Sequence, residues 1–298
     1  MNDQVWNIIQ QILQPPSLVE LLLFFLAVGL IFGLLERIFP AARRRIVRPG
    51  LGIDLIYWLF TPLVTKIITS FVLVVSVCGS FRLLDWPITE ESLNGHGPIS
   101  RQPGWLQLLE ILLIGDLIGY WMHRWFHVTW LWRFHAVHHS PRHLDWISAY
   151  RMHPFNDAAS RTAQTLPLLL IGFSPRLIIE FVPFIIVYVV FLHTNIRWKF
   201  GPLKYIFASP TYHRWHHSSE EQGIDVNYAT MFPFWDLLFG TYYLPDRQPE
   251  RYGVKDDSVP DTFIGQMLHP FVWKGPEPRP TEEVAQPVLQ QAQSGQMS

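Results

Sequence analysis

The chain has 298 residues, of which 49% are hydrophobic and 16% are charged, and its formal net charge is −1. The near-neutral balance argues against a nucleic-acid-binding protein, and the long apolar runs argue against an ordinary soluble domain. The single cysteine, Cys78, excludes an intramolecular disulfide and a zinc or iron–sulfur site built from cysteines of this chain.

The first apolar run covers residues 17–39 and is long enough to cross a bilayer. It carries no charge between Glu20 and Glu36, and positive charges follow it rather than precede it, which argues against a cleaved signal peptide. We therefore predict an uncleaved membrane helix. Its C-terminal end faces the cytoplasm because arginines gather there: Arg43, Arg44, Arg45 and Arg48.

Two further runs predict two further crossings. Residues 53–79 return across the membrane, and the polar, Pro- and Gly-rich residues 85–104 form an outer loop. Residues 105–121 form a third apolar run with a tryptophan at each end, as in an interfacial aromatic belt. This run contains Glu110 and Asp116, and ionisable groups inside a membrane helix are candidate functional residues.

Residues 163–195 contain two apolar arms joined by the sequence GFSP. The first arm is too short to span a bilayer, so we predict a hairpin that enters the membrane and returns. The return brings His193 to the same side as His123, which lies just beyond the third run.

The remaining sequence completes the predicted domain organisation. Residues 196–272 mix polar and aromatic side chains and are interpreted as a cytoplasmic cap, whereas residues 275–298 have the composition of a disordered tail. The predicted fold class is all-α, an integral membrane helical bundle with a histidine-rich di-metal cap. It forms a single domain over residues 1–274, with a catalytic core at about residues 116–243.

Most of the 13 histidines lie in three clusters, HRWFH, HAVHH and HRWHH. Their spacing of three or four residues places the rings of each cluster on one helix face. Neutral imidazole is a good ligand for iron, zinc, copper or nickel, and the rings are too many for one tetrahedral zinc but enough for two metals side by side. The clusters contain His123, His127, His135, His138, His139, His213, His216 and His217.

The other histidines are less clearly placed. His193, at the cytoplasmic end of an apolar helix, is a further candidate ligand. His153 stands directly before a proline and is a ligand, a hydrogen-bond donor behind the ligands or a helix-boundary residue, and we favour the last two alternatives. His96 lies in the outer loop, and His143 and His269 lie outside the pattern, so we expect surface residues there.

The clusters and their surroundings resemble the fatty acid hydroxylase/sterol desaturase superfamily of membrane di-iron oxygenases. The resemblance covers residues 116–243 through DLIGYWMHRWFH, WRFHAVHHS, YRMHPF, FLHTN, GPLKYIFASPTYHRWHH and NYATMFPFWDLLFGTYY. It is closer to the sterol-desaturase and alkylglycerol-monooxygenase side than to the sphingolipid 2-hydroxylases. It implies an oxidoreductase of lipid metabolism that hydroxylates or desaturates a C–H bond of a sterol, fatty acyl chain or ether lipid.

The resemblance also implies two irons as cofactor and O2 as co-substrate. The implied iron ligands are the eight clustered histidines together with His193. The chain departs from the pattern at one point, because some hydroxylases carry a histidine pair before the last cluster and here Val189 occupies the first position of that pair. The site therefore has one ligand fewer or takes one from elsewhere.

Metal-bound histidines need an acceptor for their second ring nitrogen. Asp116 lies seven residues before His123 on the same helical face and is a candidate for this role, the alternative being an ion pair with Arg124. Further candidates, for which helix caps and turns are the alternative, are Asp225, Asn227 and Asp236.

The sequence has no G-x-G-x-x-G fingerprint and no cysteines for an iron–sulfur centre. Electrons are thus expected from a separate ferredoxin, cytochrome or reductase. The alternative function is a non-redox metalloprotein such as a zinc-dependent lipid hydrolase; a Ser-His-Asp hydrolase would need a G-x-S-x-G elbow, which is absent. We expect a multi-pass protein of a bacterial cytoplasmic membrane rather than the endoplasmic reticulum. The lipid substrate stays open.

Overall fold

The computed structural model describes residues 3–43, 45–89, 91–255 and 258–273, and within these ranges it contains helices and no strand, which confirms the all-α prediction. The predicted tail, residues 275–298, lies outside the described residues. The α-helices are α1 (Asp3–Leu13), α2 (Leu18–Ile38), α3 (Leu51–Phe60), α4 (Lys66–Leu83), α5 (Gly104–Val128), α6 (Trp132–His139), α7 (Pro154–Ile171), α8 (Pro175–His193), α9 (Pro210–His216), α10 (Phe234–Phe239) and α11 (Phe263–Val272).

Short helical segments connect several of these. A π-helical turn, η1 (Thr61–Thr65), joins α3 to α4 without a break, and the 3₁₀ segments are η2 (Glu91–Asn94), η3 (Ile99–Arg101), η4 (Trp146–Tyr150), η5 (Gly201–Tyr205) and η6 (Glu221–Gly223).

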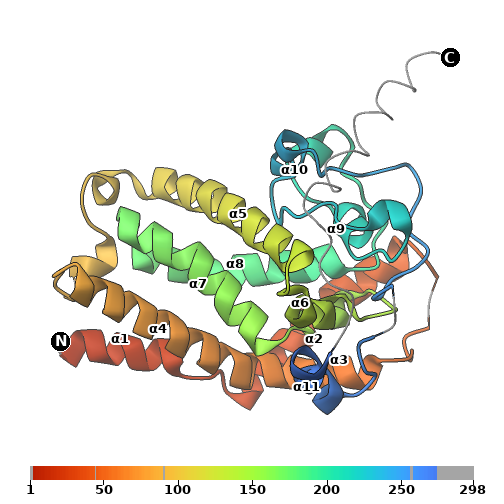
Figure 1. The fold of residues 1–298 in the computed structure, drawn as a ribbon, viewed down its shortest axis with the longest axis horizontal. Coiled ribbons are helices and arrows are strands. Elements are labelled where there is room, and N and C mark those ends of the chain that lie inside the picture. Colours follow the sequence, from red (N-terminus) through yellow and green to blue (C-terminus); the bar gives the residue numbers. More distant parts are fainter. Residues whose placement is uncertain (1–2, 44, 90, 256–257, 274–298) are drawn as a thin grey trace.

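Four helices are long and apolar enough to cross a membrane: α2, the continuous helix over residues 51–83, α5 and α8. They run lengthwise through the molecule, and α9 and α10 lie at one end (Figure 1). Many of their large apolar side chains are exposed, among them Leu23, Leu30 and Phe71. Because exposed apolar side chains on long apolar helices are stable in lipid rather than in water, the chain is an integral membrane protein.

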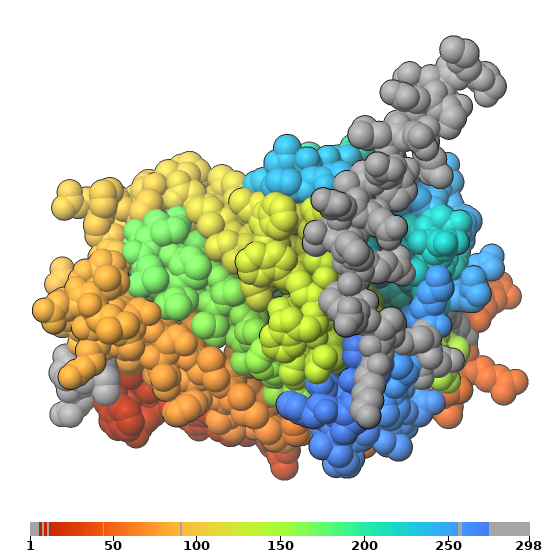
Figure 2. Space-filling model, viewed as in Figure 1, coloured from red at the N-terminus to blue at the C-terminus, as the bar shows by residue number. Residues whose placement is uncertain are grey.

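The predicted hairpin is formed by α7 and α8, but its first arm is longer than predicted. The helix α7 begins at Pro154, well before the apolar stretch at residue 163, and it fills the space between α4 and α5 (Figure 2). Its first turns carry polar side chains that bind neighbouring helices; Asp157, for example, accepts a hydrogen bond of 2.7 Å from Thr69 of α4. Because these first turns are polar, the search for apolar runs placed the start of the helix too late.

The two ends of the bundle are formed by different segments of the chain. At one end the outer loop meets the turn between α7 and α8, where the His96 amide donates to the carbonyl of Gly172. Gly172 has a φ of +114°, which favours glycine. At the opposite end lie the C-terminal ends of α5 and α8, so His193 returns to the same end as His123, as predicted.

One histidine prediction is wrong. His269 was expected at the surface, but it lies on the inner face of α11 and is 2% exposed. The reason is tertiary, because α11 packs against α3 through Phe263 and Tyr57 and against α6 through Phe271 and Phe134.

Candidate metal centre

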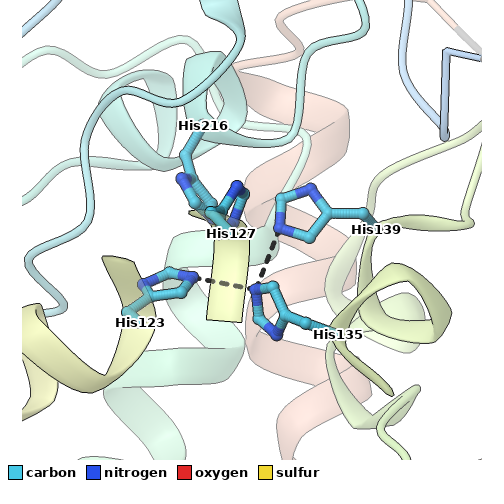
Figure 3. A group of neighbouring side chains, drawn as sticks. All are labelled: His123, His127, His135, His139 and His216. Atoms are coloured by element: carbon cyan, nitrogen blue, oxygen red, sulfur yellow. Dashed lines mark hydrogen bonds between the residues drawn. The ribbon is translucent and has the colours of Figure 1, made fainter. Parts of the chain in front are cut away.

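The nine predicted ligand residues come together in two neighbouring groups. In each group one nitrogen from every ring lies within 4.8 Å of the others. The first group (Figure 3) contains His123, His127, His135, His139 and His216. The second group contains His138, His193, His213 and His217.

Helical spacing explains how the rings divide between the groups. On α6, His135 and His139 are four residues apart and point to the first group, whereas His138 is turned about 100° from His139 and points to the second. At α9, His213 and the C-cap residue His217 point to the second group and His216 points to the first. Both short helices therefore serve both groups, which holds the groups side by side.

The hydrogen bonds of the rings define which nitrogen carries the proton. In four histidines Nδ1 lies 2.8 to 2.9 Å from a main-chain carbonyl oxygen. Since a carbonyl can only accept, Nδ1 donates its hydrogen and Nε2 is left with a free lone pair. The four pairs are His123 with Tyr228, His138 with Arg151, His193 with Val189, and His216 with Val226.

The free nitrogens then face one another. Nε2 of His138 lies 3.2 Å from Nε2 of His193, although each of these atoms carries a lone pair and neither can donate to the other. Nε2 of His123 makes a similar contact of 3.0 Å with Nε2 of His135. Lone pairs that face at this distance repel unless a cation lies among them, so the donor set fits two bound metal ions.

Burial favours the neutral form of the rings that lie outside the membrane spans, and metal ligation requires neutral rings. All nine residues except His123 and His127 are buried, and the His127 side chain is only 4% exposed. Burial, reinforced by neighbouring imidazoles, lowers the pKa of His138 to about 4. The same causes hold the pKa of four other histidines outside the membrane spans well below the usual value. These four are His139, His213, His216 and His217.

Asp225 lies in the predicted position behind a candidate ligand. Its Oδ1 is 3.2 Å from Nδ1 of His127, and its backbone has a φ of +59°. A carboxylate in this position orients the ring and makes the opposite nitrogen a stronger ligand.

The prediction for Asp116 is wrong in both of its forms. The carboxylate contacts neither His123 nor Arg124, but accepts three hydrogen bonds of 2.8 to 3.1 Å from consecutive main-chain amides. These amides belong to Thr230, Met231 and Phe232. Asp116 therefore anchors the loop before α10 to α5.

Three other candidates act through the backbone rather than on a ring. The Asn227 side chain donates to the main-chain carbonyl of Tyr243 and accepts from the main-chain amide of Tyr243, both at 2.7 Å. Asp236 accepts a 2.7 Å hydrogen bond from the Tyr228 amide. Together they shape the loop whose Val226 and Tyr228 carbonyls hold two rings. His153 is the helix-boundary residue of the two favoured alternatives: its Nδ1 caps α7 by accepting from the Phe155 amide.

The sequence pattern missed Asn156, which is 3% exposed in the first turn of α7. Its Oδ1 lies 2.7 Å from Nδ1 of His135, and its amide nitrogen lies 3.3 Å from Oγ of Ser160. The only local signal was an amide side chain two residues after the His-Pro pair. That signal does not reveal which helix the amide faces.

A buried ion network behind the second group was also missed. Asp54 on α3 lies between two arginines, 2.8 Å from Nη1 of Arg48 and 2.8 Å from Nε of Arg151. Arg48 also forms two hydrogen bonds of 2.5 and 2.6 Å with Asp145, and Arg151 reaches Ser140, the residue after α6, at 3.0 Å. This network fixes the position of the Arg151 carbonyl, which receives the ring N–H of a second-group histidine.

Comparison with known proteins adds independent information. The family described as Fatty acid hydroxylase matches residues 108–241. The ornithine lipid hydroxylase OlsE of Rhizobium tropici is 30% identical over 258 residues, covering 84% of this chain and 75% of that protein.

Alkylglycerol monooxygenases are also similar to this chain. The protein of Danio rerio is 30% identical over 175 residues, covering 57% of this chain and 37% of that protein. The protein of Homo sapiens is 33% identical over 128 residues, covering 43% of this chain and 28% of that protein. No solved structure matches the chain significantly.

Proposed function

The chain belongs to the fatty acid hydroxylase superfamily, and from this premise we propose that it is a membrane oxidoreductase that uses O2 and a di-iron centre to hydroxylate a C–H bond of a lipid. The observation that carries the proposal is the pair of adjacent groups in which buried, neutral imidazoles direct free nitrogen lone pairs at one another.

Each group would hold one iron. The nine candidate ligands are His123, His127, His135, His139 and His216 for the first iron and His138, His193, His213 and His217 for the second. When bound, the two irons supply the redox chemistry that activates O2 with electrons from a donor. Six of the nine rings have an oxygen acceptor at Nδ1, which fixes their tautomer, and the surrounding residues shield the rings from water.

Hydroxylation is favoured over desaturation because the similar proteins named above are a hydroxylase and monooxygenases. The zinc-dependent lipid hydrolase receives no support from these relatives.

The position of the centre narrows the substrate class. The candidate ligands lie at the ends of α5 and α8, on α6 and on α9 with its C-cap, not midway along the spans. A lipid in the bilayer would therefore present a C–H bond near its head group rather than near the end of an acyl chain. Lipids with an amino-acid or ether-linked polar end, as in the names of the relatives, are the substrates to test first.

The orientation and the electron donor form part of the proposal. Arginines gather between α2 and α3, at the end of the bundle that holds the histidines, which supports a cytoplasmic position for the centre. A soluble electron-transfer protein could then reach the cap from the cytoplasm.

The experiment uses the protein in lipid nanodiscs, reconstituted with iron under reducing conditions. We expect two irons per chain and, with O2, an electron-transfer protein and a bacterial lipid extract, a product heavier by one oxygen. NAD(P)H without a donor protein should give no turnover. Zinc that persists after iron loading, together with hydrolysed lipid, would overturn the proposal in favour of the hydrolase.

A further inference from the structure

The short helix α11 exposes a strip of large apolar side chains in the cap. Four of its residues are exposed, Ile264, Leu268, Phe271 and Val272, by 53% to 71%. At 100° per residue they fall within an arc of about 100°. The opposite face is covered by protein, since Gln266 and Pro270 are buried.

This strip adjoins apolar surface that belongs to a membrane span. Phe263 at the start of α11 packs edge-on against Tyr57 and Phe60 of α3, with ring centroids 5.2 and 4.9 Å apart. The same segment of α3 exposes Ile56 and Leu59 by 45% and 54%. In Figure 1, α11 lies beside α3 and below α6.

The far end of α11 continues the same surface. The ring of Phe271 contacts the ring of Phe134. Phe134 in turn packs on Phe155 at the start of α7, with the two ring centroids 4.3 Å apart. Phe155 is itself 41% exposed. The apolar strip is therefore bordered at both ends by side chains of helices that enter the bilayer.

The depth of the strip follows from the length of the span. The helix over residues 51–83 has 33 residues, or about 50 Å at 1.5 Å per residue, against about 30 Å of hydrocarbon core. Its ends therefore reach the interfacial regions, and α11 packs near the end at which the span begins. Trp273, directly after α11, is a residue type that favours this boundary.

We propose that α11 lies in the membrane interface, with Ile264, Leu268, Phe271 and Val272 inserted among the lipids of the leaflet next to the metal centre. Bilayer lipid is the occupant because the strip has no exposed polar side chain and is continuous with a lipid-facing span. The main chain of Pro270 accepts a 3.3 Å hydrogen bond from Arg133 of α6. This hydrogen bond and the contact of Phe271 with Phe134 attach α11 to α6, the helix that carries three candidate ligands.

A fluorescent depth measurement tests this proposal without any activity readout. In a Cys78→Ser background, a single environment-sensitive fluorophore is attached at Leu268→Cys in nanodiscs. Quenching is compared for lipids carrying a nitroxide near the head group, lipids carrying it deep in the acyl chain, and aqueous iodide. Matched controls are Glu221→Cys, an exposed cap position, and Ile31→Cys, a lipid-facing position in α2.

We expect the Leu268→Cys probe to be quenched most by the shallow nitroxide and little by iodide, while Ile31→Cys responds more to the deep nitroxide. An iodide response close to that of Glu221→Cys would place α11 in water and overturn the proposal. Protection from all three quenchers would mean that protein, such as a second copy of the chain, covers the strip, and would also overturn it. Failure of the lipid hydroxylation assay would leave this measurement unaffected.

Discussion

The two histidine groups consist of the same kind of ring, but only the first also uses side chains to hold its rings. In the first group, His127 and His135 donate Nδ1–H to the side chains of Asp225 and Asn156, while its other two hydrogen-bonded Nδ1 atoms donate to main-chain carbonyls. In the second group, the rings of His138 and His193 donate to main-chain carbonyls.

This difference affects how tightly each group should bind its proposed iron. A carboxylate behind a ring strengthens the opposite nitrogen as a ligand, so the first group, with five rings and Asp225, should bind its metal more tightly than the second with four. A main-chain carbonyl is present whatever side chain its residue carries, so substitution cannot remove it as an acceptor. Substitutions elsewhere can still move it. In the second group that position depends on the ion network around Asp54.

The largest expected effect comes from removing a ring of the smaller group. His138→Ala leaves three rings there, and we expect lipid hydroxylation to fall below detection and the iron content to fall from two toward one per chain. Activity is measured by mass spectrometry of the lipids and iron by elemental analysis. His96→Ala, at the opposite end of the bundle, should retain both irons. Full activity of His138→Ala would remove this residue from the centre.

Asp54→Asn tests the support of the second group without touching a ring. Removing one partner of a buried ion network costs about 3 to 5 kcal/mol, so we expect a lower unfolding midpoint in detergent together with selective loss of the second iron. The control is Asp246→Asn, because Asp246 is an exposed partner of Lys199 at 3.5 Å and should change stability by less than about 1 kcal/mol. Equal loss of both irons would show that the network does not distinguish the groups.

Asp225→Asn tests the opposite group. Asparagine tolerates the left-handed backbone of this position and still offers an oxygen to His127, so the substitution removes mainly the charge. We expect about 10- to 100-fold weaker metal binding in the first group, measured by competition with a chelator. Asp261→Asn, an exposed carboxylate near Arg142, serves as the control. Unchanged affinity would contradict a role for the carboxylate in tuning the ligand.

Asn156→Ala should have the smallest effect. It deprives Nδ1 of His135 of its acceptor, and because water can enter the space left by the side chain we expect a loss of about 1 kcal/mol, at the low end for a buried group. That corresponds to about fivefold weaker metal binding in the first group. Gln164→Ala, another amide on α7 that binds the carbonyl of Gly115, should leave metal affinity unchanged. An equal effect of both substitutions would indicate general loosening of α7.

The histidines were predictable to the extent that their geometry is local. Rings three or four residues apart share a helix face wherever the helix lies, and apolar runs of bilayer length predict spans in any context. Asp116 was misassigned because the same argument gives the side of a helix but not what packs there. Its partners, the amides of Thr230 to Phe232, lie more than a hundred residues away.

By itself the sequence determined the number of candidate ligands, their helical spacing and the apolar spans that bring them to one end of the bundle, because these properties depend on short-range periodicity and on the thickness of a membrane. Only the tertiary structure decided how α6 and α9 divide their rings between two groups, and which oxygens hold six of the nine rings. The physical reason is that most of these oxygens are main-chain carbonyls or distant side chains. A carbonyl such as that of Tyr228, 105 residues from His123, has no signature in the sequence and gains its role only through folding.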